Sequence, residues 1–263
     1  MITTINSAGL KAIARRQLAD YDAHRPGTIF SEPGFSLTLA EAYRVQMLVA
    51  DLREGRGESI VGYKVGCVSE AVQKQLGIDE PVFGHLFGSE AHRSGIALDA
   101  ESFDGLAIEG EFAFRLAEHS IGAAFAVIEL HNYVLRAPAS GRAAELIANN
   151  AMHAGVILPA DEPRCNESDD LLAETISVIR NSSVLGSANG GALPGGPAAS
   201  ITWLGARLKD FGRSLRPGQI VLTGSPLPLY PVTPGDWVEV TCSRLPGVKM
   251  TVSPGRNTAR DLE

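Results

Sequence analysis

Two glutamates separated by one residue stand inside a strongly apolar stretch of the sequence. Glu109 and Glu111 belong to GLAIEGEFAFRL at 105–116, a run with the composition of a buried β-strand. Side chains at positions i and i+2 of a strand project from the same face, so both carboxylates point the same way. If they are half-buried, either one takes up a proton or a cation lies between them. An edge strand with a solvated acidic face is the alternative, and the spacing alone leaves both interpretations open.

A lysine in an apolar, glycine-flanked run is the second candidate for chemistry. Lys64 lies in GYKVG at 62–66, where it either extends along an apolar stem to solvent or sits in a cavity with a polar task. The sequence contains no G-x-S-x-G nucleophile elbow, and Gly196 stands where a phosphate-binding loop requires lysine. The histidines have neither H-x-H nor H-E-x-x-H spacing, so we expect each to be structural; they occupy positions 24, 85, 92, 119, 131 and 153.

Composition limits the classes of protein that fit. The chain has 263 residues, 44% hydrophobic and 20% charged, with a net charge of −7. This suits one sizeable globular core and disfavours a nucleic-acid partner. No apolar stretch is long enough to cross a bilayer and the N-terminus lacks an apolar leader, so we expect a cytoplasmic protein without membrane contact. Three widely spaced cysteines, at 67, 165 and 242, suit reduced thiols.

The elements that must position these side chains follow from periodicity. Helical spacing predicts helices over 10–21 and 38–55, the second opened by a capping box at Thr38 and Glu41, and a further helix over 197–212. Short β-type runs are predicted at 59–66, 105–116, 122–130, 174–181, 219–224, 236–242 and 248–252. Because strands and helices do not alternate, an α+β fold with a mixed or largely antiparallel sheet is favoured. We expect a helical segment at 1–57 and a β-rich catalytic domain at 58–263, together forming one compact unit.

Several segments taken together resemble a known family. They are 62–87, IEGEFAF at 108–114, AVIEL at 126–130, PAASITWLGARL at 197–208, and LRPGQIVLTGS with VTPGDWVEV. In this order they are similar to the 2-keto-4-pentenoate hydratase and 2-oxo-hexenedioate decarboxylase branch of the fumarylacetoacetate hydrolase superfamily, over roughly residues 38–253. The resemblance implies a mixed β-roll preceded by a small helical part. It also implies Mg²⁺ or Mn²⁺ bound by Glu109, Glu111 and a third carboxylate, Glu129.

The resemblance assigns roles to further residues. Lys64 would be the proton shuttle or the cation that fixes the substrate carboxylate. Thr223 and Gly224 match a segment that lines the substrate pocket, and Leu76 matches a wall position for which simple core packing is an equal alternative. The implied chemistry is a metal-dependent lyase reaction on a 2-hydroxy-2,4-dienoate or 2-oxo-3-enoate in aromatic catabolism. Family members are oligomers, so we expect at least a homodimer, with the strands at 112–116 and 123–130 supplying the contact.

Some positions depart from the family pattern. Val82 stands where hydratases carry an acidic residue and decarboxylases an aliphatic one. The polar segment at 149–152 and the pair at 133–134 are altered to NNAM and YV. Val82 by itself favours decarboxylation, but the hydratases are the broader group, so we expect a hydratase first and a 2-oxo-3-hexenedioate decarboxylase second. An acylpyruvate-type C–C hydrolase, and a non-catalytic partner of another enzyme of the same pathway, are the remaining alternatives.

Overall fold

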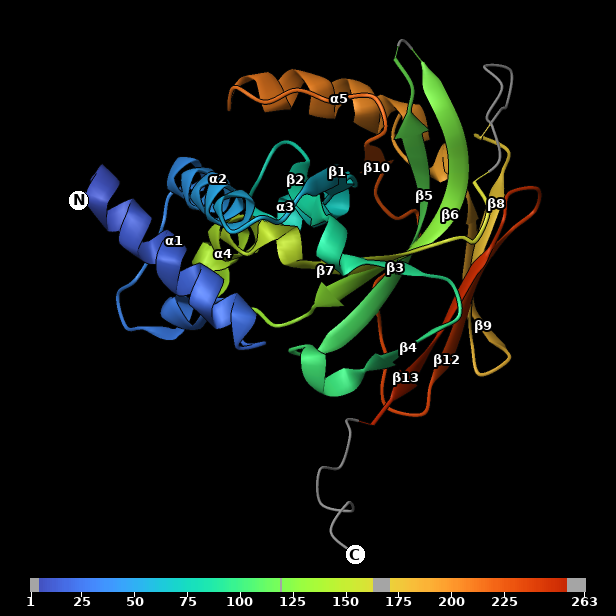
Figure 1. The fold of residues 1–263 in the computed structure, drawn as a ribbon, viewed down its shortest axis with the longest axis horizontal. Coiled ribbons are helices and arrows are strands. Elements are labelled where there is room, and N and C mark those ends of the chain that lie inside the picture. The colour runs from blue at the N-terminus through green and yellow to red at the C-terminus, as the bar shows by residue number, and fades with distance from the viewer. Residues whose placement is uncertain (1–4, 119, 163–170, 255–263) are drawn as a thin grey trace, which may run out of the picture.

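An eight-stranded mixed sheet runs through the middle of the molecule (Figure 1). This computed structural model describes residues 5–118, 120–162 and 171–254. In spatial order the strands are β2 (Val82–Phe87), β1 (Ile60–Gly66), β10 (Ile220–Leu222), β5 (Leu106–Leu116), β6 (Ile121–Asn132), β7 (His153–Leu158) and β3 (Ala91–Arg93), while β11 (Tyr230–Pro231) also pairs with β5. The pairs β1–β10 and β3–β7 are parallel and the others antiparallel, so the sheet is mixed.

A second, five-stranded sheet covers one face of the first (Figure 1). Its strands, in spatial order, are β4 (Ile96–Asp99), β13 (Val248–Ser253), β12 (Trp237–Cys242), β8 (Thr175–Arg180) and β9 (Ser183–Asn189). Alternating side chains of β12 and β13 are buried, as expected when one face of a sheet packs on a core and the other meets solvent. The two packed sheets with helices at one side confirm the α+β β-roll expected from the sequence.

The α-helices of the described residues are α1 (Ser7–Asp22), α2 (Leu39–Gly55), α3 (Glu70–Leu76), α4 (Arg142–Ala148) and α5 (Pro197–Lys209). Helices α1, α2 and α4 gather at the side of the molecule away from the second sheet, while α5 runs along another edge (Figure 1). The predicted capping box opens α2, because the Thr38 hydroxyl accepts from the Glu41 amide while the Glu41 carboxylate accepts from the Thr38 amide at 2.9 Å. The α5 helix begins at Pro197 as predicted and ends at Lys209, three residues before Gly212, whose φ of +67° closes the turn.

Strand β5 has two faces with different tasks. Ile108 and Phe112 point into the core between the sheets, and Gly110 lies between them. A Cβ on Gly110 would lie 2.8 Å from a methyl of Val178 in the second sheet, so glycine permits this close approach. Because one face of β5 is filled by the core, Glu109 and Glu111 must project from the other face.

The structure corrects two expectations. Strands β5 and β6 cannot supply an oligomer contact along 112–116 and 123–130, because Phe112, Phe114 and Phe125 are already buried inside the chain. The periodicity also missed several elements, namely α3, α4, β2, β3, β4, β7, β9 and β11. Strands β2 and β7 are buried on both faces and therefore show no alternation, while the other missed elements are seven residues or shorter.

None of the helices in the described part of the chain is long and apolar enough to span a membrane. Cys67 and Cys242 are free thiols. Cys165 and His119 lie outside the described residues. The boundary expected at residue 57 falls in the short connection between α2 and β1.

Candidate active site

The acidic pair lies in the centre of the first sheet. Strand β5 is hydrogen-bonded to β10 on one side and β6 on the other, and Glu111 is fully buried. The register of β5 and β6 sets Glu109 directly opposite Glu129, which is also fully buried. The edge-strand interpretation is therefore wrong. Three carboxylates from two paired strands share one face instead, and Glu109 is the only one of them that reaches solvent, with 21% of its side chain exposed.

Lys64 joins this cluster from strand β1, which β10 separates from β5 in the same sheet. Its side chain is 4% exposed and its Nζ lies 3.3 Å from Glu129 Oε1, so it does not extend to solvent. Burial lowers the pKa of Lys64, but the carboxylates of Glu129, Glu109 and Glu111 outweigh it and raise the pKa above its ordinary value. The cavity interpretation of this lysine is therefore the one the geometry supports.

Gly66 leaves room for the lysine head group. A Cβ at this position would lie 3.0 Å from Lys64 Nζ and 3.8 Å from a methyl of Val82. The ammonium thus passes over the glycine, and Val82 forms the neighbouring wall. This close approach explains physically why a glycine stands two residues after the lysine.

Two histidines complete the cluster, and the sequence interpretation missed both. His153 Nδ1 lies 2.7 Å from Glu129 Oε1. His131 Nε2 lies 3.2 Å from Glu109 Oε2 and 3.5 Å from Glu129 Oε2. A signal for His131 was present, because Glu129 and His131 are separated by one residue in β6 and so share a face. His153 is brought in from β7 by strand pairing and had no local signal.

The cluster holds more negative charge than its hydrogen bonds satisfy. Glu111 Oε2 accepts from the Gly224 amide at 2.8 Å, while Glu111 Oε1 and Glu129 Oε2 have no hydrogen-bond partner among the described residues. Burial and the charges of Glu129 and Glu109 raise the pKa of Glu111 well above its ordinary value. Burial also opposes ionisation of Glu129, but Lys64 and the two histidines outweigh it and lower its pKa.

These donors fit a divalent cation. Single ligand atoms of Glu109, Glu129 and His131 all lie within 4.8 Å of one another. Carboxylate oxygens are the ligands preferred by Mg²⁺ and Mn²⁺, and a cation would compensate the buried charge. Glu111 lies beside this group without belonging to it, so its assignment as a ligand stays a prediction.

Thr223 and Gly224 lie behind the acidic pair. The Thr223 hydroxyl donates to the Phe112 carbonyl at 2.9 Å and is fully buried. Gly224 adopts a φ of +90° that directs its amide to Glu111. Neither residue is among the described residues that line the cavity. The two residues therefore position Glu111 in the structure, and their predicted contact with substrate stays a prediction.

A cavity of about 630 Å³ opens in front of the cluster. Lys64, Glu109 and His131 lie on its surface, and Leu76 and Val82 belong to its wall as the resemblance implied. The rest of the described lining is largely apolar and includes Val68, Val72, Leu135, Leu146, Met152, Leu193, Pro194, Pro226, Leu227, Pro228 and Leu229. Cys67 also lines it, but burial raises the pKa of its thiol to about 11, so it is a poor nucleophile.

The altered segment at 149–152 forms part of this wall. Asn150, Ala151 and Met152 have φ values of 55°, 54° and 59°, a left-handed turn that costs about 1–3 kcal/mol per residue. The Asn150 side chain holds the turn, because its Nδ2 donates to the His85 carbonyl at 2.9 Å and its Oδ1 accepts from the His85 amide at 2.7 Å. Ala151 and Met152 thereby reach the cavity.

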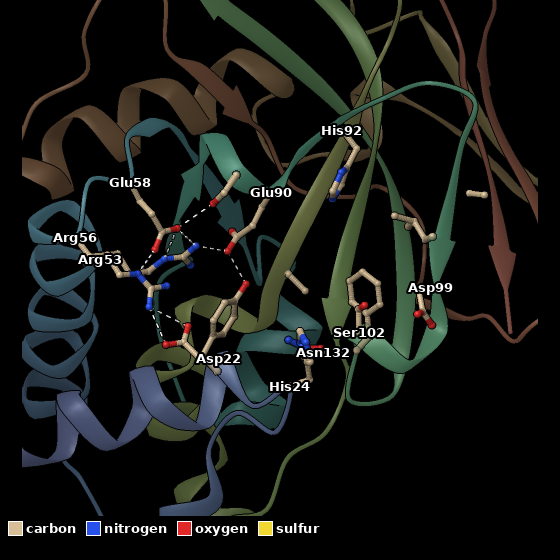
Figure 2. A pocket seen from close by; sticks show the side chains of 16 residues that line it. Asp22, His24, Arg53, Arg56, Glu58, Glu90, His92, Asp99, Ser102 and Asn132 are labelled. Carbon is tan, nitrogen blue, oxygen red and sulfur yellow. Dashed lines mark hydrogen bonds and ion pairs between the residues drawn. The ribbon is translucent and has the colours of Figure 1, made fainter. Parts of the chain in front are cut away.

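A second cavity, of about 500 Å³, is lined by charged residues that neutralise one another (Figure 2). Arg53 is 4% exposed and forms ion pairs with Glu58 and Glu90, and the Tyr21 hydroxyl donates to Glu90 at 2.5 Å. At the rim, Arg56 pairs with Asp22 at 2.7 Å. Each arginine is compensated by a carboxylate, so this cavity lacks the group of mutually close carboxylates seen in the first cavity, although Glu90 Oε2 has no hydrogen-bond partner among the described residues.

The fold is that of solved fumarylacetoacetate hydrolase family structures, which are 16–17% identical to this chain. No protein-family model matches the chain. A 2-keto-4-pentenoate hydratase of Burkholderia vietnamiensis is 35% identical over 213 residues, which are 76% of this chain and 80% of the relative. A 2-hydroxyhexa-2,4-dienoate hydratase of Comamonas testosteroni is 28% identical over 76% of this chain and 81% of its own length. The chain therefore belongs to the 2-keto-4-pentenoate hydratase family and is a lyase.

Solved structures show the same fold. The 4-oxalocrotonate decarboxylase of Pseudomonas putida G7, complexed with magnesium and adipate, superimposes with a TM-score of 0.86 at 24% identity. The match covers 95% of this chain and 99% of that one. Fumarylpyruvate hydrolase of Pseudomonas aeruginosa, in complex with Mn²⁺ and pyruvate, has a TM-score of 0.60 at 15% identity, over 73% of this chain and 88% of that one.

Proposed function

We propose that this enzyme adds water to a short 2-hydroxy-2,4-dienoate, by way of its 2-oxo-3-enoate form, and that the substrate has an uncharged tail. The observation that carries the proposal is the distribution of charge in the cavity. Lys64 and Glu109, one of the three clustered carboxylates, lie on its surface, and Lys64 is the only lysine or arginine among the described lining residues. The family relationship supports hydration as the reaction.

Glu109, Glu111 and Glu129 would hold one Mg²⁺ or Mn²⁺. Bound there, the cation would supply charge compensation and polarise the 2-oxo group of the substrate. The protein's own contribution is to fix the donors: Gly224 orients Glu111, and His153 orients Glu129.

Lys64 is the candidate proton carrier. Hydration places the hydroxyl of water on C4 and a proton on C3, after a proton has been delivered to C5 to give the 2-oxo-3-enoate. Each step requires a group that gives or accepts a proton beside the reacting carbons, and Lys64 Nζ lies on the cavity surface beside the cluster. The surrounding apolar wall excludes bulk water, which strengthens the attraction between the ammonium and an anionic substrate.

The apolar walls favour an alkyl tail over a second carboxylate. A carboxylate buried among Leu135, Leu146 and Leu227 would lack a charged partner among the described lining residues, at a cost of at least about 1–3 kcal/mol. By contrast, a methyl or ethyl tail gains about 0.8 kcal/mol per buried methylene. This difference favours monocarboxylic dienoates.

A decarboxylase acting on 2-oxo-3-hexenedioate is the second candidate. Val82 supports it, because this position is aliphatic in the decarboxylase branch that the sequence resembles. Val82 is 2% exposed and lies on the cavity wall close to the space used by Lys64. An acylpyruvate-type hydrolase would use the same carboxylate cluster, but no described residue favours it over hydration.

The test is a comparison of substrates by ultraviolet absorbance. Purified enzyme with Mg²⁺ or Mn²⁺ is given 2-hydroxypenta-2,4-dienoate, its homologue 2-hydroxyhexa-2,4-dienoate and 2-oxo-3-hexenedioate. We expect kcat/KM for the monocarboxylates to exceed that for the dicarboxylate by at least about 10-fold. Release of carbon dioxide from the dicarboxylate as the fastest reaction would refute hydration. The variant Leu76→Arg adds a cation to the wall and should narrow the difference between the two substrate types.

Two further expectations remain proposals. We propose a cytoplasmic enzyme that forms a homo-oligomer, with a contact surface other than β5 and β6. Light scattering at micromolar concentration tests the assembly, and a mass of about 28 kDa would refute it.

A further inference from the structure

His131 is a buried imidazole without an ordinary structural role. It is 2% exposed, and neither Nδ1 nor Nε2 makes a hydrogen bond to any described residue. Nevertheless Nε2 has two carboxylate oxygens nearby, Glu109 Oε2 at 3.2 Å and Glu129 Oε2 at 3.5 Å. The three atoms therefore lie close together without forming hydrogen bonds to one another, as ligand atoms do around a shared metal ion.

The spacing matches that of ligands on one metal ion. Donor atoms about 2.1 Å from a metal in adjacent octahedral positions lie about 3 Å apart. The two separations from His131 Nε2 are close to this value. An imidazole nitrogen that carries no proton binds divalent metals directly, and Nε2 of His131 is the ring nitrogen closest to these carboxylate oxygens.

His85 shows what a buried histidine looks like when it is only part of the core. Both its ring nitrogens also lack a partner among the described residues, but its ring packs against Tyr63, Phe83 and Phe87. Burial lowers the pKa of His85 to about 3, so it is a neutral core residue. His131 differs because carboxylate oxygens converge on its Nε2 at the surface of the cavity.

We propose that His131 Nε2 is a direct metal ligand together with Glu109 and Glu129, and that it biases the site towards Mn²⁺ and Co²⁺ over Mg²⁺. The inference rests on the divalent metal of the proposed function and adds the identity of a nitrogen donor. Imidazole binds later first-row metals much better than it binds Mg²⁺, whereas an all-carboxylate site favours the hard cations. A single histidine therefore changes which metal the enzyme selects.

His153 provides the matched comparison. It also lies beside Glu129, but it uses Nδ1 on Oε1, the oxygen that faces Lys64, and it is outside the group of mutually close ligand atoms. We infer that His153 positions Glu129 without contacting the metal. Replacing His153 should weaken the binding of all metals by a similar factor, because the change disturbs the shared ligand Glu129 and removes no nitrogen ligand.

The experiment measures coordination and metal preference in the metal-stripped, full-length protein. Mn²⁺ is added and nitrogen coupling is recorded by electron spin-echo envelope modulation, and the affinities for Mg²⁺, Mn²⁺ and Co²⁺ are measured by calorimetry. We expect ¹⁴N coupling in the wild type, its loss in His131→Gln and its retention in His153→Gln. The ratio of Mn²⁺ to Mg²⁺ affinity should fall at least about 10-fold in His131→Gln and stay within about twofold in His153→Gln.

Wild-type Mn²⁺ without nitrogen coupling would overturn the proposal, and this measurement needs no variant to fold. An unchanged affinity ratio in His131→Gln would also overturn it. Hydration of dienoates with saturating Mg²⁺ is assayed in parallel. If the wild type hydrates dienoates but shows no nitrogen coupling, only the assignment of His131 as a ligand is wrong. If it does not hydrate dienoates, the proposed function is wrong. If no divalent metal binds at all, both proposals fail.

Discussion

Lys64 Nζ and Glu129 Oε1 lie 3.3 Å apart although their strands are not neighbours. Strands β10 and β5 separate β1 from β6, so a flat sheet would hold the two backbones about 14 Å apart at the usual strand spacing. Curvature of the sheet and the length of the lysine side chain close this distance. The same oxygen also contacts His153, at 2.7 Å, which makes Glu129 the centre of the polar cluster.

The charge on Lys64 should be required for turnover. Lys64→Met keeps the apolar stem and removes the ammonium, so kcat should fall by roughly 10²- to 10⁴-fold if the lysine transfers protons. Mn²⁺ binding should persist, as measured by calorimetry. Lys74→Met is the control, because Lys74 is on the exposed surface of α3 and should retain full activity. Near-normal turnover in Lys64→Met would show that the residue has no part in catalysis.

Glu111 should be needed for metal affinity even though it lies deeper than Glu109. Glu111→Gln removes a buried charge that faces Glu129, and we expect Mg²⁺ and Mn²⁺ affinity to fall by at least ~10-fold. In thermal unfolding, the wild type should gain stability with added metal more strongly than the variant does. Glu101→Gln, on the exposed surface beside β4, serves as control. Equal metal affinities in Glu111→Gln and the wild type would exclude Glu111 as a ligand.

Val82 should influence the outcome of the reaction. Val82→Asp introduces a carboxylate on the cavity wall beside the space that Lys64 Nζ occupies. If an acid at this position helps to deliver water, hydration should rise relative to carbon dioxide release when both products of a 2-oxo-3-enedioate are measured. Val82→Thr has nearly the same shape without the charge and should leave the ratio unaltered. The hypothesis fails if Val82→Asp behaves like Val82→Thr.

Glu58 should make the free energy of unfolding depend on pH in the acid range. Partial burial raises its pKa, but hydrogen bonds from Arg53, Arg56 and Ser89 outweigh this and lower the pKa from 4.5 to about 2. Because the pKa of Glu58 is lower in the folded than in the unfolded state, this carboxylate stabilises the folded protein above about pH 4.5. The contribution is lost as the pH falls towards 2. Glu58→Gln should therefore be less stable than the wild type at neutral pH, with a difference that shrinks below pH 4.5.

Chemical unfolding at several pH values measures this difference. Glu70→Gln is the matched control, because Glu70 pairs with Lys74 at 3.9 Å on the exposed surface and its loss should change stability little at any pH. A stability difference for Glu58→Gln that stays constant from pH 7 to pH 3 would contradict the role assigned to the arginine contacts.

The sequence by itself determined the elements with clear local periodicity. The two-residue spacing of Glu109 and Glu111 specified a shared face, because side chains alternate along any strand. The capping box at Thr38 specified the start of α2, because its hydrogen bonds span only three residues. Lys64 was recognisable because an ammonium in an apolar run must find either solvent or a partner, although the sequence could not say which.

Only the tertiary structure decided which of these groups meet. The contact of Lys64 with Glu129 depends on the order of four strands and on the curvature of the sheet, and His153 enters through pairing of β7 with β6. The left-handed turn at Asn150 is likewise held by a contact with His85, which is 65 residues away in the chain. Such contacts depend on how whole sheets pack against one another. That packing is determined by interactions summed over the entire core, and no short stretch of sequence contains this information.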